Sequence, residues 1–358
     1  MPAPARKREV GRGERTLPGV WRLRLPLPWP GIPHCNAWAV AAGQDDLAGR
    51  GPDARTRARR GGRGRTGEGV VLFDTGLHEN GSLAHLERAL DMVGLRLEHV
   101  RLVVCTHAHI DHCGEAPAIV ERAGCELWMH PSHGHLTRSL HDPEAAFDRR
   151  MEIARSAGVP EEPLRRWSKE RAGGAFGVAG EVRPDRDLVE GRRVETDLGV
   201  WEVVETPGHA PSHVCLWQPE RRLLICGDHV LGRVSLYYDF GYTPDPVGEF
   251  LASLDRVDAL GARLCLPGHG RTFGDVAGHV EANREAVHDR VGALERLLRA
   301  DGPMTAFQTL PRLYDGELTP MTTNWWLGET LCYLRHLEVA QRVVSDGASP
   351  ARWSVAGG

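Results

Sequence analysis

Several short apolar segments of this chain run directly into polar turns that carry histidine or aspartate. These strand-like segments end at Asp74, in the cluster His107–His112, at His209, at Asp228 and at His269. They alternate with amphipathic stretches of helical spacing, which predicts an α/β architecture with helices covering the faces of a sheet. We therefore expect the strand ends to bring their polar side chains to one edge of the sheet.

The densest of these turns lies in the segment Val103–Gly114, which reads VVCTHAHIDHCG. Burying this many unpaired imidazole and carboxylate groups would be costly, whereas divalent metals bind both groups at about 2.0–2.2 Å. A lone histidine or aspartate at a strand end is more often a cap or turn residue. The turns that hold His209, Asp228 and His269 each contain a glycine, which allows the backbone to approach closely. Taken together, the five turns predict a two-metal centre.

In order along the chain, the motifs FDTG, THAHIDH, TPGH, GDH and PGHG resemble those of the metallo-β-lactamase-fold hydrolase superfamily, over roughly residues 16–273. The resemblance implies an αββα sandwich with a metal site at one edge. It assigns the first metal to His107, His109 and His209, and the second metal to Asp111, His112 and His269. Asp228 would bridge both metals, and Asp74 would anchor the loop that carries the ligands. Zinc is the expected metal, and iron or manganese would suit the same ligands.

Within the superfamily, the bridging Asp228 and the lack of a recognisable signal peptide favour the branch of glyoxalase II-like thioesterases, lactonases and nucleases. The C-terminal segment resembles the winged-helix-like extension of the β-lactamase-like protein 2 group. We expect a dinuclear hydrolase that uses a metal-bridging hydroxide, with Asp111 orienting the water and carrying a proton to the leaving group.

The expected substrate is a small ester, thioester or lactone. Tyr237 and Tyr238 lie in an aromatic loop just after Asp228 and are candidates for the wall of a substrate pocket. The alternative is a metal-dependent ribonuclease or phosphodiesterase with the same site. A regulator with a vestigial site is a third hypothesis, and the intact ligand set speaks against it.

The domain organisation follows from shifts in composition. Residues 1–15 are predicted to be disordered and 16–274 to form the catalytic domain. Within it, 44–69 form a flexible Arg/Gly-rich insertion and 131–190 a helical insertion that covers the site as a lid. Residues 275–358 are expected to form a small winged-helix-like domain with a packing or dimerisation role, so a homodimer is possible.

Charge and cysteine content indicate which class of partner and which cellular location to expect. The net charge is -4, and residues 1–68 carry 14 Lys/Arg against 6 Asp/Glu, so the basic excess lies in the part of the sequence least typical of a folded domain. That distribution favours a small-molecule substrate over a nucleic acid. No stretch is typical of a membrane span, and the eight scattered cysteines indicate reduced thiols in a cytoplasmic protein.

Overall fold

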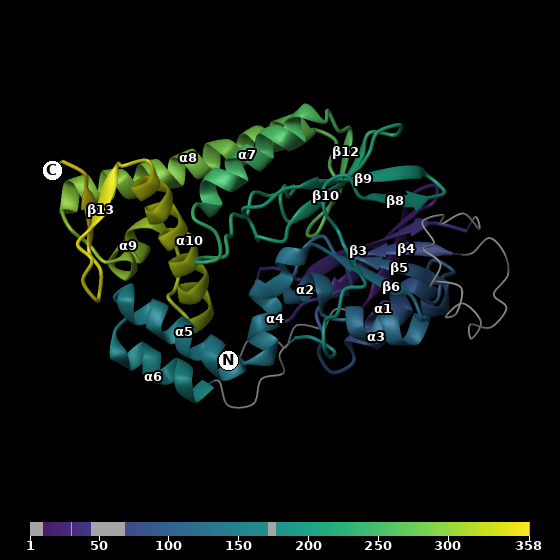
Figure 1. Ribbon diagram of the computed structural model, residues 1–358, viewed down its shortest axis with the longest axis horizontal. Coiled ribbons are helices and arrows are strands. Elements are labelled where there is room, and N and C mark those ends of the chain that lie inside the picture. The colour runs from purple at the N-terminus through teal and green to yellow at the C-terminus, as the bar shows by residue number, and fades with distance from the viewer. Residues whose placement is uncertain (1–9, 30, 44–68, 171–176, 358) are drawn as a thin grey trace, which may run out of the picture.

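Two β-sheets pack face to face in the computed structural model, which describes residues 10–29, 31–43, 69–170 and 177–357 (Figure 1). The first sheet has the strand order β1-β2-β3-β4-β5-β6-β7 and the second has the order β12-β11-β10-β9-β8. The first sheet comprises β1 (Arg12–Leu17), β2 (Val20–Pro26), β3 (His34–Ala41), β4 (Val70–Phe73), β5 (Val100–Val104), β6 (Glu126–Met129) and β7 (Arg186–Asp187). The second comprises β8 (Arg193–Thr196), β9 (Gly199–Glu205), β10 (Val214–Gln218), β11 (Leu223–Gly227) and β12 (Leu264–Pro267).

The inner faces of the two sheets share one apolar core. Trp38 and Phe73 of the first sheet pack in it with Trp201 and Leu216 of the second, and all four are fully buried. The rings of Phe73 and Trp201 lie 5.8 Å apart between centroids. Strands buried on both faces are expected to be continuously apolar, as β4 and β11 are, because helices cover their outer sides.

Helices cover both outer faces, so the layers are those of an αββα sandwich and the expected fold class is confirmed. Helices α1 (Ser82–Asp91) and α3 (Ala116–Ala123) pack on the first sheet through side chains such as Leu86 and Ile119. Helices α7 (Pro246–Ala259) and α8 (Val276–Asp301) lie on the second sheet's side. The short helix α2 (Ile110–Cys113) and the single 3₁₀ turns η2 (Leu97–His99) and η3 (Pro131–His133) complete this part.

The insertion after β6 packs against the C-terminal elements. Residues Ala154 and Leu164 of the insertion share one hydrophobic cluster with Leu298 and Ala306, and the amide of Phe307 donates to the carbonyl of Ala157 at 2.9 Å. The insertion forms α4 (Gly134–His141), α5 (Pro143–Ser156) and α6 (Glu161–Glu170), and the C-terminal segment forms α9 (Ala306–Leu313), α10 (Pro320–Val339), β13 (Val343–Ser345) and β14 (Trp353–Val355). The winged-helix likeness, the domain boundaries and a homodimer stay predictions.

The N-terminal prediction needs one correction. Residues 12–15 were expected to be disordered, but they belong to β1, which pairs with β2 in the first sheet. Their glycine content has a packing reason: a Cβ on Gly13 would come within 1.9 Å of the Ala89 carbonyl oxygen of α1. Composition alone indicated disorder, whereas the missing side chain lets the helix lie directly on the strand. Residues 1–9 of the same prediction lie outside the described residues.

The Arg/Gly-rich insertion falls almost wholly outside the described residues, which resume at Gly69. The insertion joins two neighbouring strands of the first sheet, since Ala41 of β3 and Val70 of β4 are antiparallel partners. All eight cysteines are described and unbridged, and seven of them are buried. In the described part of the chain, no helix is both long and apolar enough to cross a membrane.

Candidate metal centre

The strand ends meet at one edge of the sandwich and bring together every sequence-predicted ligand residue. The turn after β5 supplies four of them, and the turns after β9, β11 and β12 supply one each. We call this set the His/Asp centre. Its members are His107, His109, Asp111, His112, His209, Asp228 and His269.

Three imidazole rings converge in the first half of the centre. His109 Nδ1 lies 3.0 Å from His107 Nε2 and 3.0 Å from His209 Nε2. Ligand atoms of a tetrahedral zinc ion bound at 2.0–2.1 Å lie about 3.3 Å apart. The spacing of these nitrogens is therefore that of a metal-binding triplet.

The outer nitrogens of the same rings have partners that fix the tautomers. His109 Nε2 lies 3.0 Å from a carboxylate oxygen of Asp239, and His209 Nδ1 lies 3.1 Å from the Tyr237 carbonyl oxygen. Both partners are acceptors, so both outer nitrogens carry the proton. His107 Nδ1 lies 3.0 Å from the Thr106 hydroxyl. That hydroxyl already donates to Asp74 at 2.9 Å, so it accepts from His107.

With its outer nitrogen protonated, each imidazole of the triplet presents a lone pair to the shared space when the ring is neutral. Burial lowers the pKa of His209 to about 3, and the neighbouring His109 contributes to the same shift. Burial likewise holds the pKa of His107 well below its usual value. Lone pairs that face one another at 3.0 Å repel unless a cation lies among them. The triplet thus fits a divalent cation.

The second half of the centre combines imidazoles with carboxylates. His269 Nε2 lies 3.2 Å from Asp111 Oδ2 and 3.1 Å from Asp228 Oδ2. His112 Nε2 lies 3.6 and 3.4 Å from the same two oxygens. The outer nitrogen of His269 donates to the His34 carbonyl at 2.9 Å. Burial opposes protonation of His269, yet the Asp228 and Asp111 carboxylates raise its pKa well above the usual value. This half therefore attracts positive charge.

Asp228 lies between the two halves. Its Oδ2 is 3.4 Å from His112 Nε2 and 3.8 Å from His209 Nε2. Its Oδ1 is buried without a hydrogen-bond partner, and so is His112 Nε2. Buried polar atoms are almost always satisfied, so these two unpartnered atoms are available to a bound ligand. The donor set fits a second divalent cation, with Asp228 placed to touch both.

Asp74 holds the turn that carries the first four ligands. Its carboxylate accepts hydrogen bonds from the Thr106 amide at 2.7 Å, the Thr106 hydroxyl at 2.9 Å and His112 Nδ1 at 2.9 Å. The residue has a left-handed backbone with φ of 60°, a conformation that aspartate tolerates better than most side chains. Its contacts are those expected of a residue that orients metal ligands.

Glycines let the ligand turns approach closely. A Cβ on Gly268 would lie 2.2 Å from Asp228 Oδ1 and 2.6 Å from His112 Cε1. A Cβ on Gly208, which precedes His209, would lie 2.5 Å from Phe250. The sequence argument for these glycines is therefore confirmed at both positions.

Sequence reasoning missed four residues at the centre. His109 is bound by Asp239, which also lies 3.1 Å from His135 Nδ1. His135 Nε2 in turn lies 2.9 Å from the Ser212 hydroxyl, and the buried Cys35 Sγ lies 4.0 Å from His112 Nδ1. These residues come from the insertion, two loops and β3, and no shared motif links them. Only Asp239 could have been suspected from the sequence, because it is the sole acidic residue of the aromatic loop 234–242.

The two predicted pocket tyrosines differ in their surroundings. Tyr237 is half-buried, and its ring centroid lies 5.5 Å from that of His109. Tyr238 is buried and packs on Phe250 and Tyr333, with centroids 5.5 and 5.8 Å away. Both line a cavity of about 520 Å³ beside the centre.

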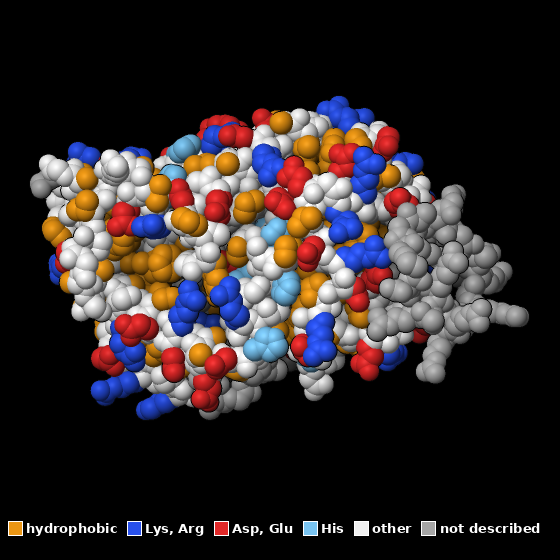
Figure 2. Space-filling model, in the orientation of Figure 1, with side chains coloured by type: hydrophobic (Ala, Val, Ile, Leu, Met, Phe, Trp, Pro, Cys, Tyr) orange, Lys and Arg blue, Asp and Glu red, His pale blue; other side chains and the backbone are white. Residues whose placement is uncertain are grey.

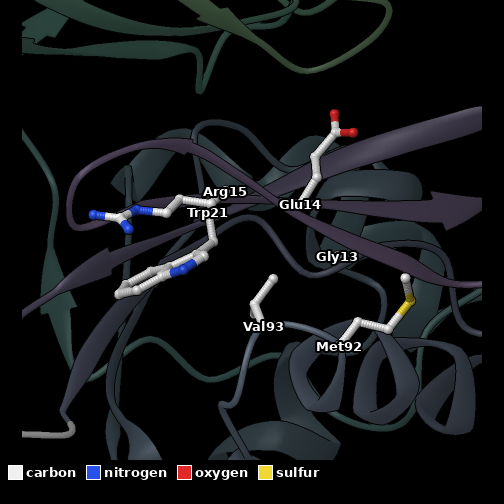
Figure 3. Close-up of a pocket in the computed structure, with 6 residues that line it drawn as sticks. All are labelled: Gly13, Glu14, Arg15, Trp21, Met92 and Val93. Atoms are coloured by element: carbon white, nitrogen blue, oxygen red, sulfur yellow. The ribbon is translucent and has the colours of Figure 1, made fainter.

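A second hollow lies away from this chemistry. Figure 3 shows it between β1, β2 and the end of α1, with Glu14, Trp21 and the exposed Met92 among its walls. None of its lining residues belongs to the His/Asp centre.

Comparison with known sequences gives a consistent assignment. Residues 64–269 match the sequence profile of the metallo-beta-lactamase superfamily. The chain is 26% identical over 292 residues to the probable metallo-hydrolase YqjP of Bacillus subtilis, covering 78% of this chain and 88% of the relative. It is 22% identical to a beta-lactamase-like protein 2 homolog of Caenorhabditis elegans, covering 70% and 68% of the two chains.

Solved structures agree with the fold over nearly the whole chain. A metallo-beta-lactamase family protein from Thermus thermophilus superposes with a TM-score of 0.76 at 27% identity, covering 95% of this chain and all of the other. A beta-lactamase domain protein from Burkholderia ambifaria gives a TM-score of 0.78 at 26% identity, covering 96% and 94%. Coverage of this extent includes the C-terminal helices as well as the sandwich.

Proposed function

The chain belongs to the metallo-β-lactamase superfamily, and from that membership we propose that it is a dinuclear metallo-hydrolase of small esters, thioesters or lactones. One observation carries the proposal: the buried His107 and His209 and the half-buried His109 direct ring nitrogens at a common point. Beside them two carboxylates lie within 3.2 Å of His269. Hydrolase activity is the coarse function that family membership supports. The two metals and the substrate class are our proposal.

We assign the ligands as the sequence analysis expected. His107, His109 and His209 would hold one cation, Asp111, His112 and His269 the other, and Asp228 both. Asp74 would keep His112 and the β5 turn in place. Imidazole-rich sites suit zinc, and iron or manganese are the alternatives. A pair of bound cations would supply Lewis-acid activation of water and of the substrate's carbonyl oxygen.

The remaining chemistry belongs to the side chains. Asp111 Oδ2, 3.2 Å from His269 Nε2, is placed to orient the attacking water and to pass a proton to the leaving group. Tyr237 would border the reacting group, because its ring lies beside both His109 and His209. The helices of the insertion would exclude bulk water as a lid, since His135 of α4 is hydrogen-bonded to Ser212 near the ligands.

We propose a cytoplasmic location, on separate grounds. All eight cysteines are unbridged, and reduced thiols are typical of the cytoplasm.

Elemental analysis combined with a substrate panel tests the proposal. We expect about two equivalents of divalent metal per chain, and turnover of at least one class among chromogenic thioesters, esters and lactones. Asp228→Ala should lose most of the metal and the activity while keeping its circular dichroism spectrum. A metal-replete sample that cleaves only RNA or bis-phosphodiesters would replace the proposal with the nuclease alternative. Unchanged turnover in Asp228→Ala would reject the two-metal assignment.

A further inference from the structure

The cavity beside the His/Asp centre is apolar along one side. It lies between α4, α5, α6, α10 and the loop 237–242, and we call it the helical cavity. Its apolar wall includes Ile153, Trp167, Phe240 and Leu327. In Figure 2 apolar side chains gather in a hollow where Figure 1 places α5 and α10, with basic side chains beside it. A wall of this kind suits a hydrocarbon or aromatic group.

The helical cavity shares residues with the surroundings of the metal ligands. Tyr237 and Asp239 line it. The carboxylate of Asp239 is bonded to His109, and the Tyr237 carbonyl is bonded to His209. A molecule that fills the cavity therefore has one end beside the first three histidines.

Three arginines supply positive charge to the same cavity. Arg138 of α4 and the neighbouring pair Arg149 and Arg150 of α5 all line it. Arg138 and Arg149 donate to backbone carbonyls, of Gly134 and Gly241, each at 3.0 Å. Among the described residues none of the three arginines pairs with a carboxylate. Guanidinium groups without an acid partner are suited to bind a carboxylate or phosphate.

The acids of the cavity are already engaged. Asp142 caps α5 by accepting from the Ala145 amide at 2.9 Å, and Asp239 is held by His109 and His135. Neither acid contacts the arginines in the described structure. The charged side chains of the cavity are therefore three arginines and two carboxylates that already accept hydrogen bonds.

A glycine keeps the cavity open on the α10 side. Gly328 lines the cavity, and a Cβ built on it would meet its nearest atom, the Tyr238 carbonyl oxygen, only at 4.0 Å. A side chain at this position fits the helix and would project into open space. Gly328 is thus a site where the cavity can be filled without disturbing the backbone.

We infer that the helical cavity binds the apolar, anionic end of an acyl substrate, with its negative group at Arg138, Arg149 and Arg150. The negative group is a carboxylate or a phosphate. This inference rests on the proposed function and narrows its substrate class to amphiphilic anions. In the reaction, water adds its oxygen to the acyl carbon, the bond from that carbon to the ester oxygen or thioester sulfur breaks, and the leaving group takes a proton.

Kinetics with a matched substrate series tests the inference. One series would consist of esters with a common alcohol, and a second of thioesters with a common thiol. In each series the ten-carbon acyl chain ends in methyl, carboxylate, phosphate or trimethylammonium. We expect kcat/KM for the better anionic substrate to exceed that for the methyl-ended one by about tenfold, and the cationic one to be poorest. The carboxylate and phosphate arms identify which anion the arginines prefer. Equal kcat/KM across the series would overturn the inference.

Variants locate the effect. Arg150→Gln and Arg138→Gln should each reduce the preference for an anionic end, whereas Arg165→Gln, on the exposed side of α6 and outside the cavity, should not. Gly328→Leu should reduce kcat/KM for ten-carbon chains much more than for acetyl esters, with Gly328→Ala in between. An equal loss for both chain lengths would contradict the placement of the chain in this cavity.

A binding measurement separates this inference from the proposed function. Calorimetry with decyl phosphate, decanoate and decanol should show tighter binding of an anion than of the alcohol. Binding should persist in Asp228→Ala and weaken in Arg150→Gln. Anion binding without any hydrolysis would reject the hydrolase but keep the cavity assignment. Binding lost in Asp228→Ala and kept in Arg150→Gln would mean that the anion occupies the metal site, which would overturn the inference.

Discussion

His109 Nε2 lies 3.0 Å from Oδ2 of Asp239, a residue 130 positions further along the chain. Burial opposes protonation of His109, but the Asp239 carboxylate raises its pKa. A carboxylate behind a ligating imidazole fixes the ring and makes its other nitrogen a stronger donor to a cation. Asp239 is therefore a positioning residue for the first three histidines.

Asp239→Asn should weaken metal binding by about 10–100-fold, the usual effect of removing such an outer partner. The asparagine oxygen can still accept from one imidazole, so the fold should persist. Competition between the protein and a chromogenic chelator measures the affinity directly, without reference to turnover. The matched control is Asp142→Asn, an acid of the same cavity that caps a helix and touches no ligand. Equal metal affinity in both variants would remove Asp239 from this role.

Gly268→Ala should disrupt the second half of the centre. The new methyl group would fall within 2.2 Å of Asp228 Oδ1 and 2.6 Å of His112 Cε1, so both ligands must shift. We expect the variant to lose at least one metal equivalent by elemental analysis while remaining folded. Gly274→Ala is the control, because a Cβ there comes no closer than 3.4 Å to any atom. Full metal content in Gly268→Ala would mean that the turn relaxes without cost to the site.

The sequence could predict the ligand turns because each follows an apolar strand. A strand ending in His or Asp has its side chain placed by the sheet, so position along the chain translates into position at one edge. The same logic fails for Asp239 and His135. They lie in a loop and in an inserted helix, and their meeting at His109 depends on how those segments pack.

Composition misled at the N-terminus for a related reason. Glycines that permit close packing, such as Gly13 under α1, look the same in sequence as glycines of a disordered segment. The helical cavity was likewise invisible in sequence, because α5 and α10 are far apart along the chain and meet only through tertiary packing. The aromatic residues of the loop 234–242 marked the region but not its arginines.

Metal binding should contribute measurably to stability. A cation that binds the His/Asp centre of the folded chain, and not the unfolded chain, shifts the equilibrium toward the folded state. At free metal 100 times the dissociation constant, the expected gain is about 2.7 kcal/mol, seen as a rise in Tm of several degrees. Scanning calorimetry with added zinc and with chelator measures the difference. Asp228→Ala should show little of it, and an identical chelator effect in that variant would argue that the metal acts elsewhere.

A buried acid in the C-terminal helices should make stability depend on pH. Glu329 of α10 is 7% exposed and accepts a hydrogen bond from the Tyr333 hydroxyl at 2.6 Å. Burial raises its pKa from 4.5 to about 7. Tyr314 and Arg290 are the other polar neighbours that influence it.

Between pH 4.5 and 7 the folded chain holds a proton on Glu329 that the unfolded chain has lost. The contribution of this proton to the free energy of unfolding is therefore fully present below pH 4.5, and it is lost as pH rises through about 7. Its full size is about 3 kcal/mol, from 1.36 kcal/mol per pKa unit. Glu329→Gln keeps an acceptor for Tyr333 and removes the titration, so it should be more stable than the parent at pH 8 and similar at pH 4.5. Urea unfolding of metal-free parent and variant across this range measures the difference. Parallel pH profiles for the two proteins would show that Glu329 titrates at its ordinary value.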